Sequence, residues 1–219
     1  MHGTITDITV QVRNPERCSI FLDGAFAFGL QRMVAAQAGL AVGQALDEQA
    51  VAALLTGDEA ERAYERTLRY LSYRPRSEQE VRQYLARKEI DEQTAEAVMA
   101  RLRRAHLVDD EGFAAFWIEN REAHRPKGPA ALKLELRQKG LDGEVIEAAL
   151  ESLDEQGSAE RVAERFTDRY AHLDEATFRK RLYGLLQRRG FRFDVCRKVV
   201  EASWAQVSAQ RDGDDDRGQ

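Results

Sequence analysis

Apolar and polar residues alternate along the first thirty positions, which is the pattern of half-buried β-strands. The alternation covers residues 4–12, with one slip near Asp7, and residues 17–30, where it continues on both sides of Asp23 and Gly24. An Asp-Gly pair between two alternating runs favours a tight hairpin turn, because both central residues of a type I′ turn need positive φ. The pattern therefore predicts three short antiparallel strands.

Two glycine turns in the stretch AGLAVGQAL precede a change of pattern. Asp47 is placed to cap a short helix, and Gly57 is placed to end it. From Asp58 to about Val207 the apolar residues recur every three or four positions, as they do in amphipathic helices. We therefore expect a small β-rich N-terminal domain with a short helix over residues 1–57, followed by a mainly helical region.

Within this helical region, a short phrase occurs three times, about 50 residues apart: LARKEI at 85–90, LRQKGL at 136–141 and LQRRGF at 186–191. When the leading leucines are aligned, an apolar residue also lies four positions before each of them and five positions after it. Residues four apart lie on one face of a helix, so these positions form a stripe that faces a core. The spacing predicts an internal repeat with three helices in each copy.

The residues that flank these helices recur as well. Asp91 and Asp142 stand where a following helix needs an N-cap, whereas Asp194 lies two places later in the third copy. Gly140 and Gly190 are suited to end the preceding helix. The same start and stop signals therefore predict similar helix boundaries in successive copies.

These signals divide the chain into a β-rich domain, three repeats and a tail. The expected boundaries are 1–57 for the β-rich domain, 58–107, 108–154 and 155–208 for the three-helix repeats, and 209–219 for a disordered acidic tail. A three-helix unit of this size buries little on its own, so neighbouring repeats are expected to stack. The predicted fold class is mainly α: three tandem three-helix repeats that form an elongated, curved body, preceded by a small antiparallel β-hairpin domain.

The formal net charge of −5 hides an uneven distribution, since 32% of all residues are charged. Basic residues gather on the expected middle helix of each repeat, and acidic residues gather on its neighbours. Cations near a helix C-terminus gain about 0.3–1 kcal/mol from the helix dipole, which accounts for some of them. It does not account for Arg74 or Arg179, which lie at or before a helix start. A recurring basic edge suits a polyanion or an acidic protein groove.

Other functional classes lack their signals. There is no apolar run long enough to span a membrane, no secretory signal pattern and no CxxC motif, so we expect a cytoplasmic protein. There is also no phosphate-binding glycine loop and no GxSxG elbow. His106 followed by Asp109 and Asp110 could suggest a metal site, but a helix end followed by an N-cap is the simpler interpretation. We expect no enzyme activity, no metal and no cofactor.

Four stretches of the chain, taken together, resemble one family. They are YLSYRPRSEQEVRQYLARKEI, LVDDEGFAAFWIENR, KGPAALKLELRQKGL and FRKRLYGLLQRRGFRFDVCRKVV. In this order they resemble the RecX family, the regulators of the bacterial RecA recombinase. The resemblance covers roughly residues 62–204, and residues 1–57 look like the N-terminal extension of some members. The chain departs from the family pattern at Glu89, where a glycine is commoner, and in its acidic net charge.

The resemblance implies a non-catalytic protein that lies in the helical groove of the RecA–DNA filament. Proteins of this family inhibit strand exchange, ATP hydrolysis and co-protease activity, and they promote or hold filament disassembly. These activities belong to DNA repair, recombination and the SOS response. For this chain the resemblance implies the RecA filament as partner, single- or double-stranded DNA as a further partner, no membrane partner and a monomeric state.

The charge pattern, rather than the resemblance, selects the residues expected to contact the partner. They are Arg74, Arg76, Arg82, Lys127, Lys133, Arg137, Lys139, Arg179, Arg181, Arg188, Arg189 and Arg192. Two other hypotheses stay open. One is a nucleic-acid-binding module that acts alone, which the basic middle helices favour. The other is a helical-repeat scaffold for a different protein, which rests on composition alone.

Overall fold

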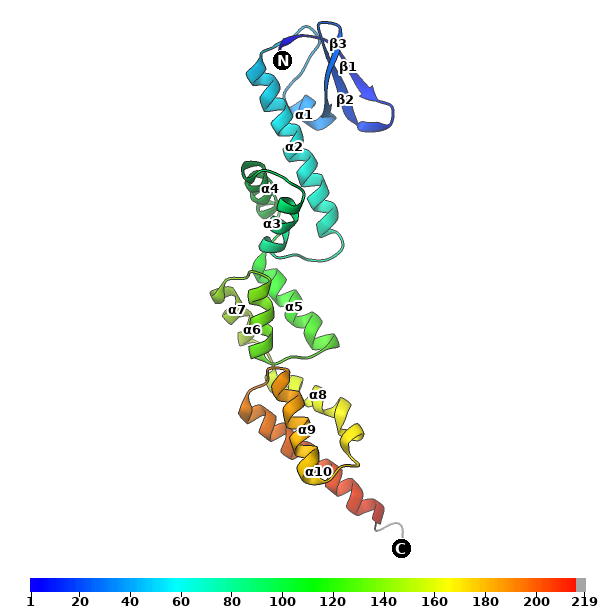
Figure 1. Ribbon diagram of the computed structural model, residues 1–219, viewed down its shortest axis with the longest axis vertical. Coiled ribbons are helices and arrows are strands. Elements are labelled where there is room, and N and C mark those ends of the chain that lie inside the picture. The colour runs from blue at the N-terminus through cyan, green and yellow to red at the C-terminus, as the bar shows by residue number, and fades with distance from the viewer. Residues whose placement is uncertain (216–219) are drawn as a thin grey trace. The chain divides into compact units, whose positions relative to one another are not determined.

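The computed structural model describes residues 1–215, and the side chains as far as Arg211. These residues form a mainly α-helical chain with one antiparallel sheet near its N-terminus, as predicted (Figure 1). They make two compact units, one built from Met1–Arg76 and Glu80–Val108, the other from Ser77–Gln79 and the residues from Asp109 onward. The first unit holds the sheet and most of the first repeat, and the second unit holds the other two repeats.

The sheet has four strands in the order β3-β2-β1-β4, and every neighbouring pair is antiparallel. The strands are β1 (Gly3–Gln11), β2 (Asn14–Leu22), β3 (Ala25–Gln31) and β4 (Ala45–Leu46). The three predicted strands are confirmed, whereas the two-residue strand β4 is too short to give a pattern. A register shift between Ile5 and Asp7 explains the slip in the alternation there. Asp23 and Gly24 both have positive φ, 48° and 85°, as the predicted hairpin turn requires.

One face of the sheet packs against α1 (Arg32–Gln37) and the N-terminal half of α2 (Glu48–Leu71). The centre of this core is formed by Ile5, Ile20, Leu30, Val51 and Leu54. As predicted, Asp47 caps α2, because its side chain accepts a hydrogen bond of 2.7 Å from the Ala50 N–H. The short helix α1 follows β3 directly and was not expected from the sequence pattern.

The predicted helix end at Gly57 is wrong. Helix α2 continues through this residue, so one helix belongs to both the sheet core and the first repeat. A glycine inside a helix costs about 0.5–1 kcal/mol relative to alanine. Burial on both sides of the glycine offsets this cost, because Val51 lies in the sheet core and Ala63 and Tyr64 lie in the core of the repeat.

The first repeat consists of the C-terminal half of α2 together with α3 (Glu78–Arg87) and α4 (Glu92–Arg104). The recurring apolar residues Val81 and Leu85 of α3 are fully or almost fully buried, and Met99 of α4 lies in the same core. The helical stripe predicted from the repeat is therefore the stripe that faces the core.

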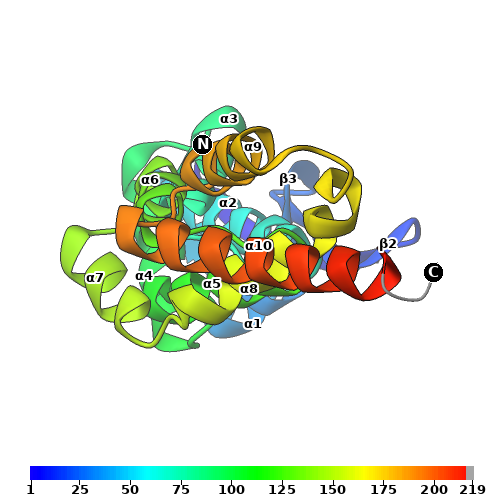
Figure 2. The same ribbon diagram turned by 90° about the horizontal axis from the view of Figure 1, so that it is seen from below.

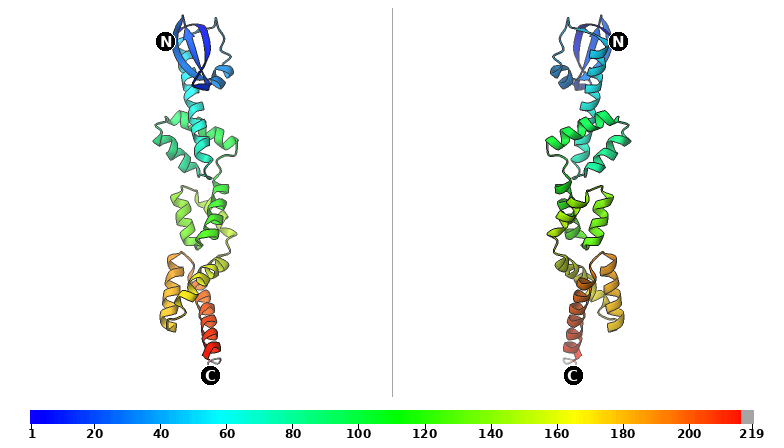
Figure 3. Two further views of the ribbon diagram at one scale, coloured as in Figure 1. Left: turned by 90° about the vertical axis from the view of Figure 1, so that its right-hand side faces the viewer. Right: turned by 90° about the vertical axis from the view of Figure 1, so that its left-hand side faces the viewer.

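The second unit contains two further repeats of three helices each, which follow one another along the chain in Figures 1 and 3. They are α5 (Asp110–His124), α6 (Pro129–Gln138) and α7 (Gly143–Glu151), then α8 (Glu155–Tyr170), α9 (Glu175–Arg188) and α10 (Phe193–Asp215). Helix α10 packs against both α8 and α9 (Figure 2). The aligned apolar residues are again fully buried, as predicted: Leu132, Leu136, Leu182 and Leu186.

The predicted start and stop signals lie at helix ends. Asp91 and Asp142 each cap the third helix of their repeat by accepting a hydrogen bond from a first-turn backbone N–H. Gly140 and Gly190 both have φ of 85°, the left-handed conformation that glycine adopts without strain. In the first repeat Glu89 takes a similar conformation, with φ of 57°.

Helix α10 extends further than the sequence predicts. It begins at Phe193, so Asp194 lies in its first turn. At its other end it continues to Asp215, so the predicted disordered tail does not begin at residue 209. Arg211 of this extension donates hydrogen bonds to carbonyl groups of the loop between α8 and α9. The remaining four tail residues, 216–219, lie outside the described residues.

Candidate interaction surface

Three of the predicted contact residues lie in the first unit: Arg74, Arg76 and Arg82. Arg74 makes two hydrogen bonds of 2.9 Å to the Glu80 carboxylate, and these bonds raise the pKa of Arg74 above its ordinary value. Arg82 on α3 forms an ion pair with Glu96 on α4. Both arginines are therefore tied to acids of their own repeat.

Arg76 takes part in a stack of aromatic rings. Its guanidinium lies 4.1 Å from the centre of the Tyr70 ring, and Tyr70 stacks on Tyr84 with ring centres 4.3 Å apart. Lys88 lies 6.0 Å from the centre of the Tyr84 ring. A cation–π contact contributes about 0.5–1 kcal/mol at an exposed site. Arg76 therefore contributes to the packing of the first repeat.

The carboxylate of Glu135 organises the basic residues of the second repeat. It accepts hydrogen bonds of 2.8 Å from Trp117 Nε1 and from Arg121 Nε, and it also pairs with Lys127. Burial by itself would raise the pKa of Glu135, but these hydrogen bonds together outweigh burial, and the pKa is lowered. The predicted contact residue Lys127 is thus a member of this network.

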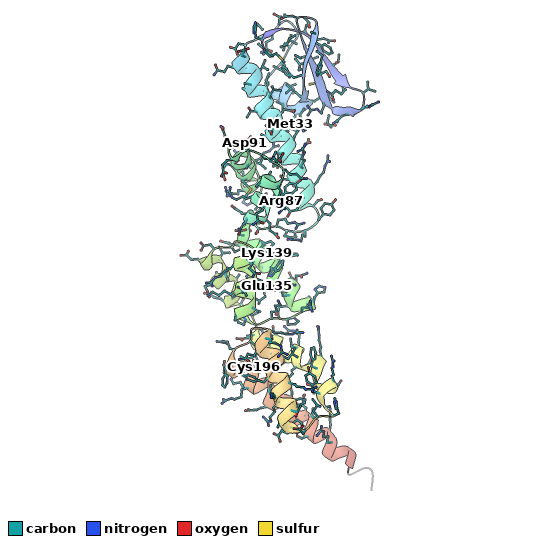
Figure 4. All side chains as sticks on the ribbon, viewed as in Figure 1. Met33, Arg87, Asp91, Glu135, Lys139 and Cys196 are labelled. Atoms are coloured by element: carbon teal, nitrogen blue, oxygen red, sulfur yellow. The ribbon has the colours of Figure 1, made fainter. Side chains whose placement is uncertain are left out.

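The other three candidates of the second repeat differ in their surroundings. Lys133 pairs with Glu147 on α7. The Lys139 amino group lies 4.9 Å from the centre of the Trp117 ring, and Figure 4 shows Lys139 near Glu135 at the end of α6. Arg137 is exposed and has no acidic partner among the described residues.

The third repeat carries the remaining five candidates, of which four lie at its surface: Arg179, Arg181, Arg188 and Arg192. Arg179 pairs with Glu175 one turn earlier, at 2.7 Å. Arg192 pairs with the buried Glu155, at 2.6 Å. Arg181 and Arg188 are exposed, and among residues 1–211 neither has an acidic partner.

Arg189 is half-buried in the second unit. Its guanidinium lies 5.7 Å from the centre of the Phe166 ring and donates a hydrogen bond of 3.4 Å to the Pro126 carbonyl. Burial, followed by repulsion from Arg125 and Arg165, lowers the pKa of Arg189. Arg189 is therefore a packed residue rather than an open contact.

The predicted contact residues thus divide into three kinds. Those paired with an acid are Arg74, Arg82, Lys127, Lys133, Arg179 and Arg192. Those that lie against an aromatic ring are Arg76, Lys139 and Arg189. The exposed ones without an acidic partner within the described chain are Arg137, Arg181 and Arg188. These last three are best placed to contact a partner, and the role of the whole set stays a prediction.

A further group of arginines, which the repeat pattern does not single out, lies in the first unit. Arg62, Arg66 and Arg69 share one face of α2. Together with Arg17 of β2 they line a cleft of about 680 Å³. Arg17 is itself tied to the buried Asp58, with 3.2 Å between Nη1 and Oδ2. The spacing of four and three residues along α2 is a sequence signal that could have revealed this face.

The residues that could have suggested catalysis occupy helix ends and cores. His106 follows α4 with φ of 51°, and Asp109 caps α5 through two first-turn N–H groups, as predicted. Burial raises the pKa of Cys18, and it raises the pKa of Cys196 to about 11. Within the described residues no cluster of three or more His, Cys, Asp or Glu side chains is placed to hold a metal ion. Each helix of the same residues is too short or too polar to cross a membrane.

A small β-domain followed by consecutive three-helix domains with charged exposed faces defines a modular helical-repeat protein. Comparison with family models identifies the family to which this architecture belongs. The models of the Regulatory protein RecX N-terminal domain and of the first, second and third RecX three-helix domains match residues 3–47, 63–102, 109–150 and 154–200. The chain belongs to the RecX family, as the sequence motifs predict.

Individual relatives agree with this assignment. The chain is 33% identical over 216 residues to the Regulatory protein RecX of Bacillus subtilis (strain 168). The aligned region covers 97% of this chain and 80% of that protein. It is 38% identical over 162 residues to the Regulatory protein RecX of Halalkalibacterium halodurans, covering 72% and 61% respectively. A crystal structure of regulatory protein RecX matches with a TM-score of 0.78 and 30% identity, over 92% of this chain and 100% of that one. Family membership supports a regulatory role.

Proposed function

We propose that this protein is a non-catalytic regulator that binds the RecA–DNA filament and inhibits its recombinase, ATPase and co-protease activities. In this proposal it lies in the helical groove of the filament, in the cytoplasm, and thereby modulates DNA repair, recombination and the SOS response. The observation that carries the proposal is the match to four RecX domain models, in chain order, between residues 3 and 200.

Exposed cations on the middle helices of two consecutive repeats support binding to a partner that offers more than one anionic contact. Arg137 lies on the middle helix of the second repeat, and Arg181 and Arg188 lie on the middle helix of the third. A filament offers the same groups at regular intervals, so several weak contacts can act together, with each contact raising the effective concentration for the next. The proposal also assumes that the repeats stack into an elongated, curved body, which stays a prediction.

The test is a titration of the purified protein into RecA that is assembled on single-stranded DNA. DNA-dependent ATP hydrolysis should fall when the protein is added at or below one molecule per RecA protomer. Electron microscopy of the same samples should show filaments that are shortened or coated. Undiminished hydrolysis at a large excess of the protein would contradict the proposal.

A second candidate function, direct nucleic-acid binding without RecA, is favoured by the arginine cleft of the first unit. If the three arginines of α2 in this cleft each neutralise one phosphate, the affinity for single-stranded DNA should depend on salt with a log-log slope of about −2. Measurements of binding over a range of salt concentrations give this slope. A slope near zero, or no binding at moderate salt, would exclude this candidate.

A further inference from the structure

The third repeat has a groove of about 580 Å³ between α9 and α10, which falls in the range of roughly 300–1,000 Å³ that is usual for ligand pockets. Its floor includes Tyr183, Gly184 and Val200. Its rim carries the cations Arg179, Lys180, Arg188 and Arg197, beside the acid Glu201. An apolar floor below a cationic rim suits a ligand that combines apolar and anionic groups.

In the first two repeats an ion pair joins the middle helix to the third helix at the position equivalent to this groove. Arg82 on α3 pairs with Glu96 on α4, and the two residues are 14 positions apart in the chain. Lys133 on α6 pairs with Glu147 on α7, again 14 positions apart. Both pairs join the middle helix of a repeat to its third helix at the same position of the repeat.

In the third repeat these two positions hold Tyr183 and Arg197, so a ring and a cation replace the ion pair. The acid contact of Arg197 is with Glu201 on the same helix, at 4.0 Å between two exposed side chains. An exposed pair of this kind contributes little, so Arg197 is available to an external carboxylate. Phe193, which is 68% exposed, packs edge-on against Tyr183 with ring centres 5.9 Å apart and extends the apolar surface.

Gly184 keeps the floor of the groove open. A Cβ at this position would lie 3.2 Å from the end of the flexible Arg188 side chain and within 4 Å of no other described neighbour. The equivalent positions of the other repeats carry the exposed residues Gln83 and Leu134, so the helix tolerates a long side chain here. Glycine is also a poor residue for a helix interior. Neither packing nor helix stability therefore explains why residue 184 is a glycine. Access to the groove does explain it, because a glycine leaves the floor uncovered.

We propose that this groove binds an acidic peptide segment of a protein partner. One apolar side chain of the segment enters over Gly184, and its carboxylates pair with Arg188 and Arg197. In the first two repeats the position of Arg197 is held by the acids Glu96 and Glu147, so only the third repeat offers a cation there to an external carboxylate. The inference rests on the proposed function in taking the partner to be a protein, and it adds the chemistry of the contact. A nucleic acid supplies the anions but no aliphatic side chain for the floor.

The first experiment measures binding of a probe by fluorescence anisotropy. The probe is a fluorescein-labelled peptide of acidic residues around a central Leu-Phe pair, and the protein is the full chain. We expect saturable binding that Gly184→Leu weakens at least tenfold, because the leucine fills the floor. Gly184→Gln, which copies the first repeat, should do the same. The melting temperatures of both variants should equal or exceed that of the wild type, since both residues favour a helix over glycine. Equal affinities, or no binding by the wild type, would overturn the proposal.

A matched pair of charge reversals tests the rim. Arg188 and Arg87 are both exposed residues in the last turn of a middle helix, at the same position of their repeats. Arg188→Glu should weaken peptide binding at least fivefold, and Arg87→Glu less than twofold. Equal losses of peptide affinity in the two variants would show that the peptide is held by general charge attraction, and would contradict binding in the groove. The double variant Tyr183→Lys with Arg197→Glu, which installs the ion pair of the second repeat, should abolish binding.

Two further comparisons separate this inference from its alternatives. A labelled single-stranded oligonucleotide should bind wild type and Gly184→Leu with equal affinity. If Gly184→Leu lowered the affinity for the oligonucleotide but not the affinity for the peptide, the inference would be overturned. If the wild type binds the peptide but does not slow RecA ATP hydrolysis, the proposed function fails and the groove assignment stands. If it slows hydrolysis but does not bind the peptide, the groove assignment fails and the proposed function stands.

Discussion

At the residue scale, Glu135 shows how this chain holds many of its basic side chains. Its carboxylate receives hydrogen bonds from Trp117, Arg121 and Lys127, so one acid compensates two cations beside a partly buried indole. Removing one partner of such a network leaves the others unsatisfied, which costs more than the net gain of an exposed ion pair. The fold therefore depends on this acid more than on the exposed ion pairs of the repeats.

Replacing Glu135 by glutamine should lower the free energy of unfolding at neutral pH by about 1–3 kcal/mol. The pKa of Glu135 is lowered in the folded protein, so its contribution is present above the unfolded-state pKa and is lost as the pH falls through the folded-state pKa. The wild type should thus lose more stability than Glu135→Gln between about pH 5 and pH 3. Urea unfolding at a series of pH values measures both effects.

Glu147→Gln is the control for this prediction. Glu147 also pairs with a lysine of the same repeat, but its side chain is 59% exposed. An exposed pair contributes about 0–1 kcal/mol, so the variant should remain close to the wild type. If Glu147→Gln lowered the free energy of unfolding as much as Glu135→Gln does, the argument that burial makes Glu135 the more important acid would be contradicted.

Glu89 supports a second prediction at this scale. It has φ of 57°, whereas the equivalent positions of the other repeats hold Gly140 and Gly190. The left-handed conformation costs a non-glycine residue roughly 1–2 kcal/mol, so Glu89→Gly should raise the free energy of unfolding by about 0.5–1 kcal/mol. The same exchange at Glu92, which lies in the first turn of α4, should instead lower it by about 1 kcal/mol. Thermal unfolding followed by circular dichroism distinguishes the two.

At the element scale, the recurring leucines hold each three-helix unit together. Leu136 of α6 is fully buried with Phe113 and Ile146, and the equivalent Leu85 and Leu186 are buried in the other repeats. Two of the three middle helices are short, since α3 and α6 each contain 10 residues, whereas α9 contains 14. Isolated helices of this length are marginal in water, so packing of the leucine face stabilises them.

Leu136→Ala should therefore lower the free energy of unfolding by about 2–5 kcal/mol. Leu134→Ala, two residues away on the same helix, is the matched control, because Leu134 is 59% exposed. A surface substitution of this kind stays within about 0.5 kcal/mol of the wild type. Chemical unfolding measures both variants, and similar losses in the two would contradict the assignment of the core face.

The helix boundaries show which elements could be predicted from local signals. Asp91 and Asp142 cap helices as expected, because capping depends on residues within one turn. The helix end expected at Gly57 is wrong, because tertiary burial along α2 outweighs the low helix propensity of one glycine. Boundaries that depend on packing between helices and the sheet could not be read from spacing.

At the scale of the whole molecule, the proposed regulation depends on several exposed cations rather than on one site. Arg137→Glu and Arg181→Glu should each raise the concentration needed for half-maximal inhibition of RecA ATP hydrolysis by a few fold, about 0.5–1 kcal/mol each. The double variant should show roughly the product of the two effects, because the sites are separate and their free energies add. Arg104→Glu, an exposed residue of α4 outside the predicted contacts, is the control. Unchanged inhibition by the double variant would remove these residues from the interface.

The sequence by itself determined the division into a β-domain and three helical repeats, the hairpin turn and most helix ends. These features follow from spacing, from caps and from residues that tolerate positive φ, all of which act within a few positions of the chain. Only the tertiary structure decided which basic residues are open to a partner. Ion pairs such as Arg82 with Glu96 and Lys133 with Glu147 join different helices, so their formation depends on how the helices pack. The same packing decides that the third repeat, with Gly184 on its middle helix, has a groove.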